Sequence, residues 1–403
     1  MISLAMIVKD EAARLAACLA SAAPAVDEIV VVDTGSTDGT PDLARAHGAR
    51  VIEWRWRDDF AAARNQALAL AGGPWILALD ADERLAPGAA ERVRTLVAGA
   101  SADGFNCRLV STLPPDQPSS TIEHRYCRLF RKRPGVAYEG RVHEQIAPSI
   151  VRTGGRIAPS DVTILHAGYA RSNPAKLRRN LGLLRRMLAD QPDDAFTRFN
   201  LGLALVETGD WPEACAALER VVTAPAALSP QLVAVAWMKL AEGRLQHGAA
   251  AAAAEAANHA LATQPDLAQA RYLLGCALLE QGAPRAAALL FDELVDAPAD
   301  ALGMRLHPRI VGIARAQARL RQRQYAEAAS ILEPVAEDDP SGEALLHLGN
   351  AYLTLGRLGD AAGAYRTARA RGVADPDLDR RLALCTRLSD LAARAGHVGA
   401  ARS

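Results

Sequence analysis

The sequence predicts an α/β domain followed by an all-α array of helical repeats. Up to about residue 170, short apolar runs alternate with helical patterns, whereas the chain from about 175 to 390 is Ala- and Leu-rich helix in which one pattern recurs. The 403 residues exceed one ordinary domain, and half of them are apolar. We therefore expect domains at 1–170 and 196–390, a linker helix at 171–195 and a C-terminal tail at 391–403.

Four apolar segments of the first part are expected to form buried parallel strands. They are nearly continuous apolar runs at residues 2–8, 28–34, 50–54 and 75–80. Helical patterns separate them, and in the one after the second run Thr40 is the expected N-cap and Gly48 the expected end. This alternation predicts a sheet with helices on both faces, in which ligands bind at the carboxyl ends of the strands.

Each expected strand ends in a polar cluster, which favours a site at this edge over unrelated loops. The clusters are Lys9-Asp10-Glu11, Asp33-Thr34-Gly35-Ser36, Trp54-Arg55 and Asp80-Ala81-Asp82.

Four segments that occur in order along residues 2–170 resemble family 2 glycosyltransferases of the Rossmann-like GT-A fold. They are "SLAMIVKDEAARLAACLAS", "DEIVVVDTGSTDGT", "DDFAAARNQALALAGGPWILALDADE" and "YCRLFRKRPGVAYEGRVHEQI". More narrowly, they resemble the bacterial branch fused to tetratricopeptide repeats, which includes peptide S-glycosyltransferases. The resemblance implies an inverting, metal-dependent transfer of a sugar from a nucleotide-sugar donor, with a UDP-sugar favoured, to a peptide, protein or glycan acceptor.

The Asp80-Ala81-Asp82 triplet matches the DxD motif of this family. By resemblance, Asp82 binds Mg²⁺ or Mn²⁺, and Asp80 faces the metal or the donor ribose; such an ion would neutralise a leaving pyrophosphate. Alternation along an extended chain would put both carboxylates on one side. A lone DxD can instead be a solvated strand end. His166 is a further candidate metal ligand, because GT-A enzymes often supply a C-terminal histidine, although a lone histidine is more often structural.

Further candidates for binding the nucleotide sugar, together with Asp80, are Lys9, Asp10, Glu11, Asp33, Arg64 and Asn65. By resemblance, Asp33 accepts a hydrogen bond from uracil, but it could also stabilise a turn or cap a helix. Asp10 could equally be a helix N-cap. Arg64 could reach a phosphate or the DxD carboxylates, or it could form a weak surface ion pair.

The basic segment 125–146 interleaves arginines with aromatic residues. By resemblance to the family, it follows the sheet and lies on the acceptor side. Inversion needs a general base that takes the acceptor proton. Glu144 is the candidate base, with His143 as its neighbour and second candidate, while an ion pair between Glu144 and Arg141 is the structural alternative. Because successive strand residues point to opposite sides, we expect at most one of the two neighbours to face the acceptor.

Equivalent positions recur every 33 to 41 residues in the second part, close to the period of tetratricopeptide repeats. They are Leu201, Leu240, Leu274, Arg315 and Leu348, and an alanine follows each after thirteen residues, at Ala214, Ala253, Ala287, Ala328 and Ala361. The pattern predicts about five helix pairs in a solenoid, which would bind the acceptor or join two chains in a homodimer. The fourth repeat departs most, because Arg315 replaces an apolar residue.

Composition and short sequence patterns limit the expected partners, the compartment and the class of enzyme. The formal net charge of zero gives no pull toward nucleic acid, and no apolar run reaches the length of a transmembrane helix. The six cysteines lack CxxC pairing and a secretory N-terminus is not expected, so we predict reduced thiols in a cytoplasmic protein. A nucleotidyltransferase would carry a Gly-rich loop after its first strand, where this chain has "VKDEAARL". A catalytically inactive scaffold acting through the repeats remains the alternative function.

Overall fold

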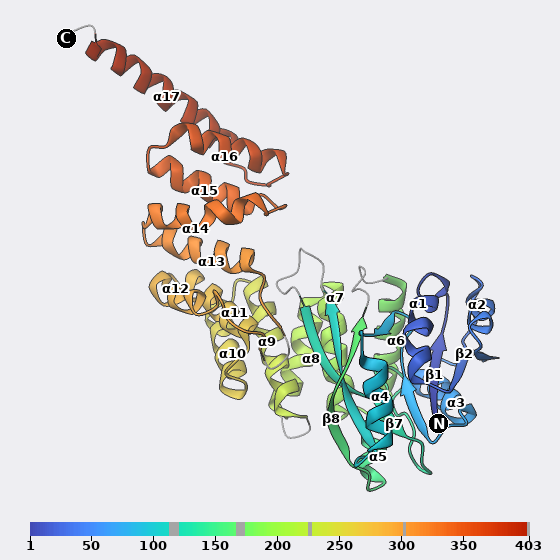
Figure 1. Ribbon diagram of the computed structural model, residues 1–403. Helices are drawn as coiled ribbons and strands as arrows, with labels where there is room; N and C mark the ends of the chain where they lie inside the picture. Colours follow the sequence, from blue (N-terminus) through green and yellow to red (C-terminus); the bar gives the residue numbers. More distant parts are fainter. Residues whose placement is uncertain (113–120, 167–173, 225–227, 301–303, 401–403) are drawn as a thin grey trace. The chain divides into compact units, whose positions relative to one another are not determined.

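The computed structural model describes residues 1–112, 121–166, 174–224, 228–300 and 304–400 (Figure 1). The chain forms two compact units. The first extends from Met1 to Leu228 and holds the sheet and helices α6 to α8; the second holds helices α9 to α17. The domain boundary expected near residue 170 lies outside the described residues.

One mixed eight-stranded sheet forms the centre of the first unit, in the order β3-β2-β1-β4-β7-β6-β8-β5. The strands are β1 (Ile2–Val8), β2 (Glu28–Asp33), β3 (Arg50–Glu53), β4 (Trp75–Ala78), β5 (Glu83–Leu85), β6 (Gly104–Thr112), β7 (Thr121–Arg131) and β8 (Ile157–His166). The four strands expected from the apolar runs are β1 to β4, and they are parallel, as predicted. Strand β7 joins β4 antiparallel and makes the sheet mixed, which the sequence analysis did not anticipate.

The expectation of burial is wrong for β3. This strand pairs only with β2 at the edge of the sheet, so its residues are exposed or half-buried.

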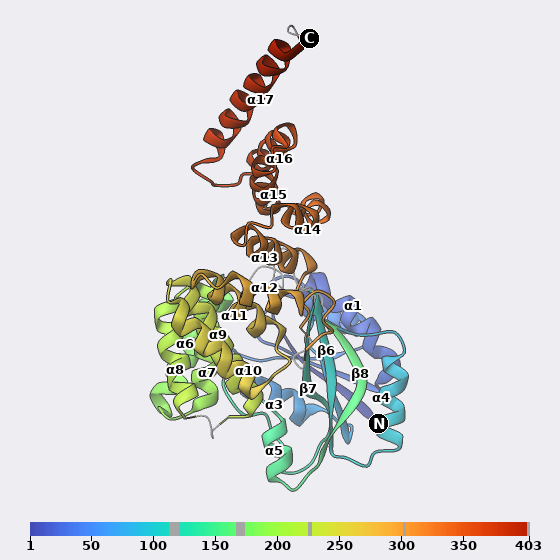
Figure 2. The same cartoon turned by 90° about the vertical axis from the view of Figure 1, so that its left-hand side faces the viewer.

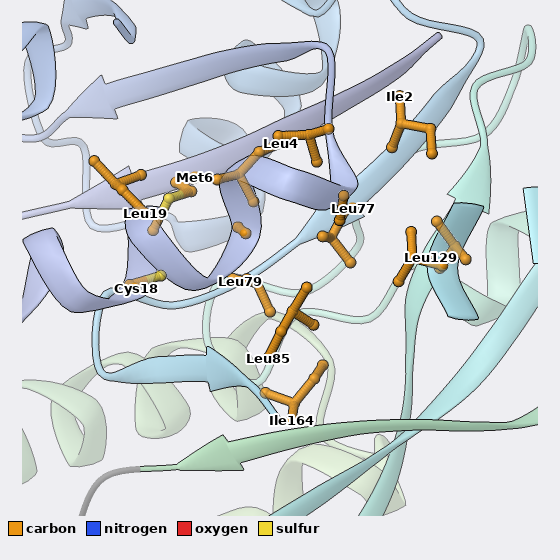
Figure 3. Packing of buried hydrophobic residues seen from close by; sticks show 14 of the residues in the cluster. Ile2, Leu4, Met6, Cys18, Leu19, Leu77, Leu79, Leu85, Leu129 and Ile164 are labelled. Carbon is orange, nitrogen blue, oxygen red and sulfur yellow. The ribbon is translucent and has the colours of Figure 1, made fainter. Parts of the chain in front are cut away.

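Helices cover both faces of the sheet, as predicted, because alternate side chains of β1 belong to two different cores. Leu4 and Met6 pack with Cys18 and Leu19 of α1 (Ala12–Ala22) and with residues of β4 and β7 (Figure 3). Ala5 belongs to the opposite core. The helices that contribute to that opposite core are α3 (Phe60–Leu70) and α5 (Ala147–Arg152), while α4 (Ala89–Ala98) lies with α1.

Helix α2 (Thr40–Ala46) begins one residue earlier than its expected cap implies. Gly39 is the N-cap, and Thr40 lies inside the helix, so the capping role predicted for Thr40 is wrong. The Thr40 hydroxyl instead accepts a hydrogen bond from the Glu11 amide at 2.8 Å and donates one to Asp38 at 2.5 Å. Gly48 has φ +78° just beyond the helix end, as expected for a glycine that terminates a helix.

Helices make up most of the described residues after β8. Helix α6 (Pro174–Asp190) is followed by five antiparallel pairs: α7 (Ala195–Thr208) with α8 (Trp211–Thr223), α9 (Pro230–Gln246) with α10 (Ala250–Thr263), α11 (Ala268–Glu280) with α12 (Pro284–Asp292), α13 (Pro308–Arg321) with α14 (Tyr325–Glu337), and α15 (Glu343–Thr354) with α16 (Leu358–Ala370). In both views, successive helices of the second unit lie side by side (Figures 1 and 2). Helix α17 (Leu378–Ala400) extends through the described part of the tail expected at 391–403.

Small residues let the two helices of a repeat approach each other closely. The five alanines that follow the repeated position are fully buried: Ala214, Ala253, Ala287, Ala328 and Ala361. A Cβ atom on Gly275 would lie 2.5 Å from the Phe291 ring, and one on Gly349 would lie 2.5 Å from the Tyr365 ring. The glycine of the first helix therefore accommodates an aromatic side chain from the second.

The irregular fourth repeat has an electrostatic explanation. The Arg315 guanidinium donates to Asp292 at 2.7 Å, and Arg319 donates to the other oxygen of the same carboxylate at 2.7 Å. Asp292 ends α12 of the preceding repeat, so an ion pair joins two repeats at the position where the others have an apolar residue.

None of the helices in the described ranges is long and apolar enough to cross a membrane.

The glycine packing predicts a selective effect of a larger side chain. Gly275→Val should destabilise the second unit by about 1–3 kcal/mol more than Gly363→Val, because only the first substitution overpacks against a neighbour. Gly363 lies in α16 with no atom within 4 Å of an added Cβ, so it controls for helix propensity. Denaturant unfolding of the full chain measures both, and equal midpoints would contradict the packing argument.

Candidate active site

A cavity of about 720 Å³ in the first unit opens at the carboxyl ends of β1 and β4. Eight of the residues expected from the sequence line it: Lys9, Glu11, Arg64, Asp80, Asp82, His143, Glu144 and His166. The cavity is therefore lined both by the acids at the strand ends, which are expected on the donor side, and by the segment around residue 144, which is expected on the acceptor side.

Arg64, on the buried side of α3, connects these two parts. Its Nη2 donates to Asp80 Oδ1 at 2.5 Å, and its Nε donates to Glu144 Oε1. The side chain is buried, which excludes the surface ion pair considered above. Burial alone would lower the pKa of Arg64, but the charges of Asp80 and Glu144 outweigh it and raise that pKa, so the guanidinium stays charged.

A second arginine, Arg128 of β7, neutralises the other side of Asp80. Its Nη2 lies 3.2 Å from Asp80 Oδ2 and 2.6 Å from the buried Glu83 carboxylate. The Glu83 carboxylate also accepts a hydrogen bond from the Asp80 amide at 2.8 Å. Burial would raise the pKa of Asp80, but Arg64 and Arg128 hold it well below its ordinary value. Burial raises the pKa of Glu83 to about 7. Both oxygens of Asp80 are thus paired with arginines.

The DxD triplet is a turn rather than an extended strand end, so the alternation expected for it is wrong. The Glu83 amide donates to the Asp80 carbonyl at 3.0 Å, which closes the turn. As a result Asp80 and Asp82 have different partners. Asp82 Oδ2 lies 3.3 Å from His166 Nε2, and the other ring nitrogen of His166 lies 3.1 Å from the Ser111 hydroxyl.

The Asp82 and His166 side chains form the part of the cavity that suits a divalent metal. The hydrogen bond with Asp82 raises the pKa of His166; burial would raise the pKa of Asp82, but the bond to His166 lowers it. Within the described ranges, no three His, Cys, Asp or Glu side chains converge as a complete metal site. Mg²⁺ and Mn²⁺ sites that use one or two carboxylates complete their coordination with water and phosphate oxygens, so Asp82 could supply the carboxylate and His166 a further ligand once its ring is neutral.

The two candidate bases lie in an irregular segment, not in a strand, and both line the cavity. The expectation that only one of them could face it is therefore wrong. His143 has φ +55°, which breaks the alternation of side chains. The residue is exposed at the mouth of the cavity, but the protein atoms around its ring partly desolvate it and lower its pKa, so the neutral imidazole is favoured. The ion partner of Glu144 is Arg64 and not Arg141, which corrects the structural alternative.

Three predicted site residues, Asp10, Asp33 and Asn65, do not line the cavity and have hydrogen-bond partners elsewhere. Asp33 accepts from the amides of Gly35 at 3.1 Å and Ser36 at 3.0 Å, so its carboxylate stabilises the turn after β2. The amide of Asn65 pairs with both backbone groups of Tyr138, at 2.8 and 2.9 Å.

Asp10 is not the helix N-cap considered above, because Glu11 precedes α1. Its carboxylate accepts from the Thr37 amide at 2.7 Å instead.

Other lining residues were not assigned from the sequence. Arg128 was visible only as part of a basic segment, and its role depends on how β7 pairs with β4. Lys176, Arg179 and Asn180 of α6 also line the cavity. In the sequence these three residues look like the solvated face of a basic helix, and no local signal distinguishes such a face from a cavity wall.

Comparisons with known proteins identify the families that the two parts of the chain match. Residues 3–146 match glycosyl transferase family 2, and residues 177–231, 238–301 and 313–377 match the tetratricopeptide repeat. The chain is 41% identical over 219 residues to a TPR repeat-containing protein of Synechococcus elongatus, covering 52% of this chain and 53% of that protein.

Several of the matched relatives are named as glycosyltransferases. Over 213 residues the chain is 28% identical to the SPbeta prophage-derived glycosyltransferase SunS of Bacillus subtilis, covering 51% of this chain and 49% of that protein. Over 104 residues it is 36% identical to an uncharacterized glycosyltransferase of Rickettsia felis, covering 26% and 36%. The matches thus span about half, or less, of the length of these relatives. The chain carries a family 2 glycosyltransferase domain at its N-terminus, and tetratricopeptide repeats follow it.

Proposed function

We propose that the chain is an inverting glycosyltransferase that moves a sugar from a nucleotide-sugar donor, with a UDP-sugar favoured, to a peptide, protein or glycan. The observation that carries this proposal is the buried Arg64, which binds Asp80 of the DxD turn and Glu144 of the opposite wall. One rigid cation therefore fixes the distance between the proposed donor side and the proposed acceptor side. Such pre-organisation is what a displacement between two bound substrates requires.

The donor side is proposed to use a divalent cation. Asp82 and His166 would hold Mg²⁺ or Mn²⁺, which would neutralise the pyrophosphate of the leaving nucleotide. Asp80 is proposed to act without touching the metal, because Arg64 and Arg128 occupy both of its oxygens. It orients the two guanidinium groups in the cavity wall.

The acceptor side is proposed to use Glu144 as the general base. Arg64 binds Oε1 of this carboxylate, which leaves Oε2 to take the proton of the attacking nucleophile. His143 is the rival, because its lowered pKa keeps the ring neutral and able to accept a proton.

The repeats suggest a peptide or protein as acceptor, since solenoids of this kind commonly bind extended segments or mediate dimers. The homologue names support glycosyl transfer and do not specify the acceptor.

A donor panel tests the proposal directly. The full chain is incubated with UDP-, GDP- and ADP-sugars with and without Mn²⁺, and release of the nucleoside diphosphate is measured. Slow hydrolysis of one donor, faster with metal, is the expected result. A chain that binds no nucleotide and hydrolyses no donor would favour the inactive scaffold instead.

Removal of the metal ligand predicts a large loss of turnover. Asp82→Asn should lower donor turnover by at least about 100-fold, because a metal supplies several kcal/mol of charge stabilisation in such reactions. EDTA should have a comparable effect on the wild type, and Mn²⁺ should reverse it. Asp161→Asn, at an exposed position of β8 outside the cavity, is the matched control. Full activity in EDTA would refute metal dependence.

Glu144→Gln distinguishes the two candidate bases. The amide keeps an oxygen for Arg64 but loses basicity, so transfer to the acceptor should fall by roughly 100-fold or more while nucleotide binding is retained. His143→Gln should have a smaller effect. If His143 is the base, wild-type transfer should decline as the pH falls through its lowered pKa, because protonation removes the accepting lone pair. Wild-type rates in Glu144→Gln, together with that decline, would assign the base to His143.

A further inference from the structure

Helix α6, the first helix after the sheet, forms one wall of the cavity. Lys176, Arg179 and Asn180 are the α6 residues in the lining. This helix belongs to the same compact unit as the sheet. Its contribution to the cavity therefore arises within the first unit.

Apolar packing and one ion pair hold α6 in this place. Leu181 and Leu184 share a buried cluster with Val142, and Phe60 at the start of α3 packs against the same cluster. Farther along the helix, Arg186 lies 3.2 Å from Asp58. Helix α6 is thus fixed both to the segment of the candidate base and to the loop after β3.

Arg179 differs from the other arginines in the cavity. Its guanidinium lies 5.0 Å from the centroid of the Phe60 ring and 5.8 Å from that of Trp56, and it donates to the Asn180 side chain at 3.3 Å. Among the ion pairs of the described residues, none joins Arg179 to a carboxylate, whereas Arg64 and Arg128 each bind two. Burial lowers the pKa of Arg179. The charge of Asp58 partly offsets this effect of burial, but Asp58 pairs directly with Arg186 and not with Arg179. A half-buried guanidinium that no carboxylate pairs directly is suited to receive an anion.

Lys176 lies one helical turn before Arg179, so both side chains face the cavity from the same side of α6. Its amino group is 3.5 Å from Glu11, at the end of β1, and its side chain is 57% exposed. This loose pair can rearrange when a stronger anion enters. Lys176 therefore lies near the end of β1, where Lys9 and Glu11 were expected to bind the nucleotide sugar, and Arg179 lies near Trp56, in the loop after β3.

We propose that Lys176 and Arg179 bind the diphosphate of the nucleotide-sugar donor, so that α6 is part of the donor site. The inference rests on the proposed function. It follows from charge: Asp80, Glu83 and Glu144 already neutralise Arg64 and Arg128, which leaves Lys9 and the two α6 cations, among the lysines and arginines of the lining, for the phosphates. Arginine suits this role because its planar donors bind two phosphate oxygens at once.

Titration calorimetry of the full chain with UDP, UMP and uridine tests the assignment; if the donor panel selects another base, the matching nucleotides replace them. Arg179→Gln should weaken UDP binding by roughly 10- to 100-fold, the usual contribution of a charge-assisted hydrogen bond. Uridine affinity should stay unchanged. Arg179→Lys should recover part of the loss, and Lys176→Gln should lower UDP affinity by about 3-fold, as expected for an exposed pair.

Arg178→Gln is the matched control and should bind all three ligands like the wild type. Arg178 is the neighbouring residue of the same helix, is exposed, and donates to the Pro174 carbonyl at 3.2 Å outside the cavity lining. Thermal melting identifies any variant that fails to fold. If Arg179→Gln is one of these, the exposed Lys176→Gln and the charge-preserving Arg179→Lys decide the question.

The outcomes separate the two proposals. Wild-type UDP affinity in both Arg179→Gln and Lys176→Gln would overturn the diphosphate assignment while leaving the proposed transferase function intact. An equal loss of uridine and UDP binding would give Arg179 a purely structural role and also overturn it. A selective rise in the KM of an acidic peptide acceptor, with UDP binding unchanged, would reassign the cations to the acceptor. If the wild type binds no nucleoside diphosphate, the proposed function itself fails.

Discussion

Arg64 links α3 to two carboxylates that come from distant parts of the first unit, Asp80 after β4 and Glu144 in the segment before α5. A buried guanidinium is costly unless carboxylates compensate its charge, so the fold that buries Arg64 must also deliver both acids. Arg128 repeats the arrangement from β7 and adds the buried Glu83. The site is therefore an alternating chain of charges whose members hold one another in position.

This chain of charges divides the acids of the DxD turn between two tasks. Each carboxylate oxygen of Asp80 accepts a hydrogen bond from an arginine, whereas Oδ2 of Asp82 lies 3.3 Å from Nε2 of His166. The turn, closed by a bond from the Glu83 amide to the Asp80 carbonyl, is what sends the two side chains to different partners. A motif that looks like a symmetric pair of acids thus provides one structural carboxylate and one candidate ligand.

The helical part follows a simpler physical rule. Where a repeat needs its two helices in close contact, a glycine of the first helix meets a large side chain of the second, as Gly275 meets Phe291 and Gly349 meets Tyr365. Helix α6 contributes to the candidate active site as well as to the packing of the helices. Its apolar face packs with Val142, and Arg179 lines the cavity. Position in the fold, rather than local sequence, gives α6 that double contact.

The sequence by itself determined the parallel strands β1 to β4, the helices on both faces of the sheet and the five helix pairs, because apolar periodicity and small residues at a fixed spacing are local properties. Most of the site residues that it indicated line the cavity, since polar strand ends of a parallel sheet meet at one edge. Tertiary structure alone decided the pairing of β7 with β4, the burial of Arg64 against Glu144 and the reach of Arg179 into the cavity. It also decided that Asp33 stabilises the turn after β2 and that Asn65 binds the Tyr138 backbone. Which charges become partners depends on distances across the fold, and the spacing of residues along the chain does not contain those distances.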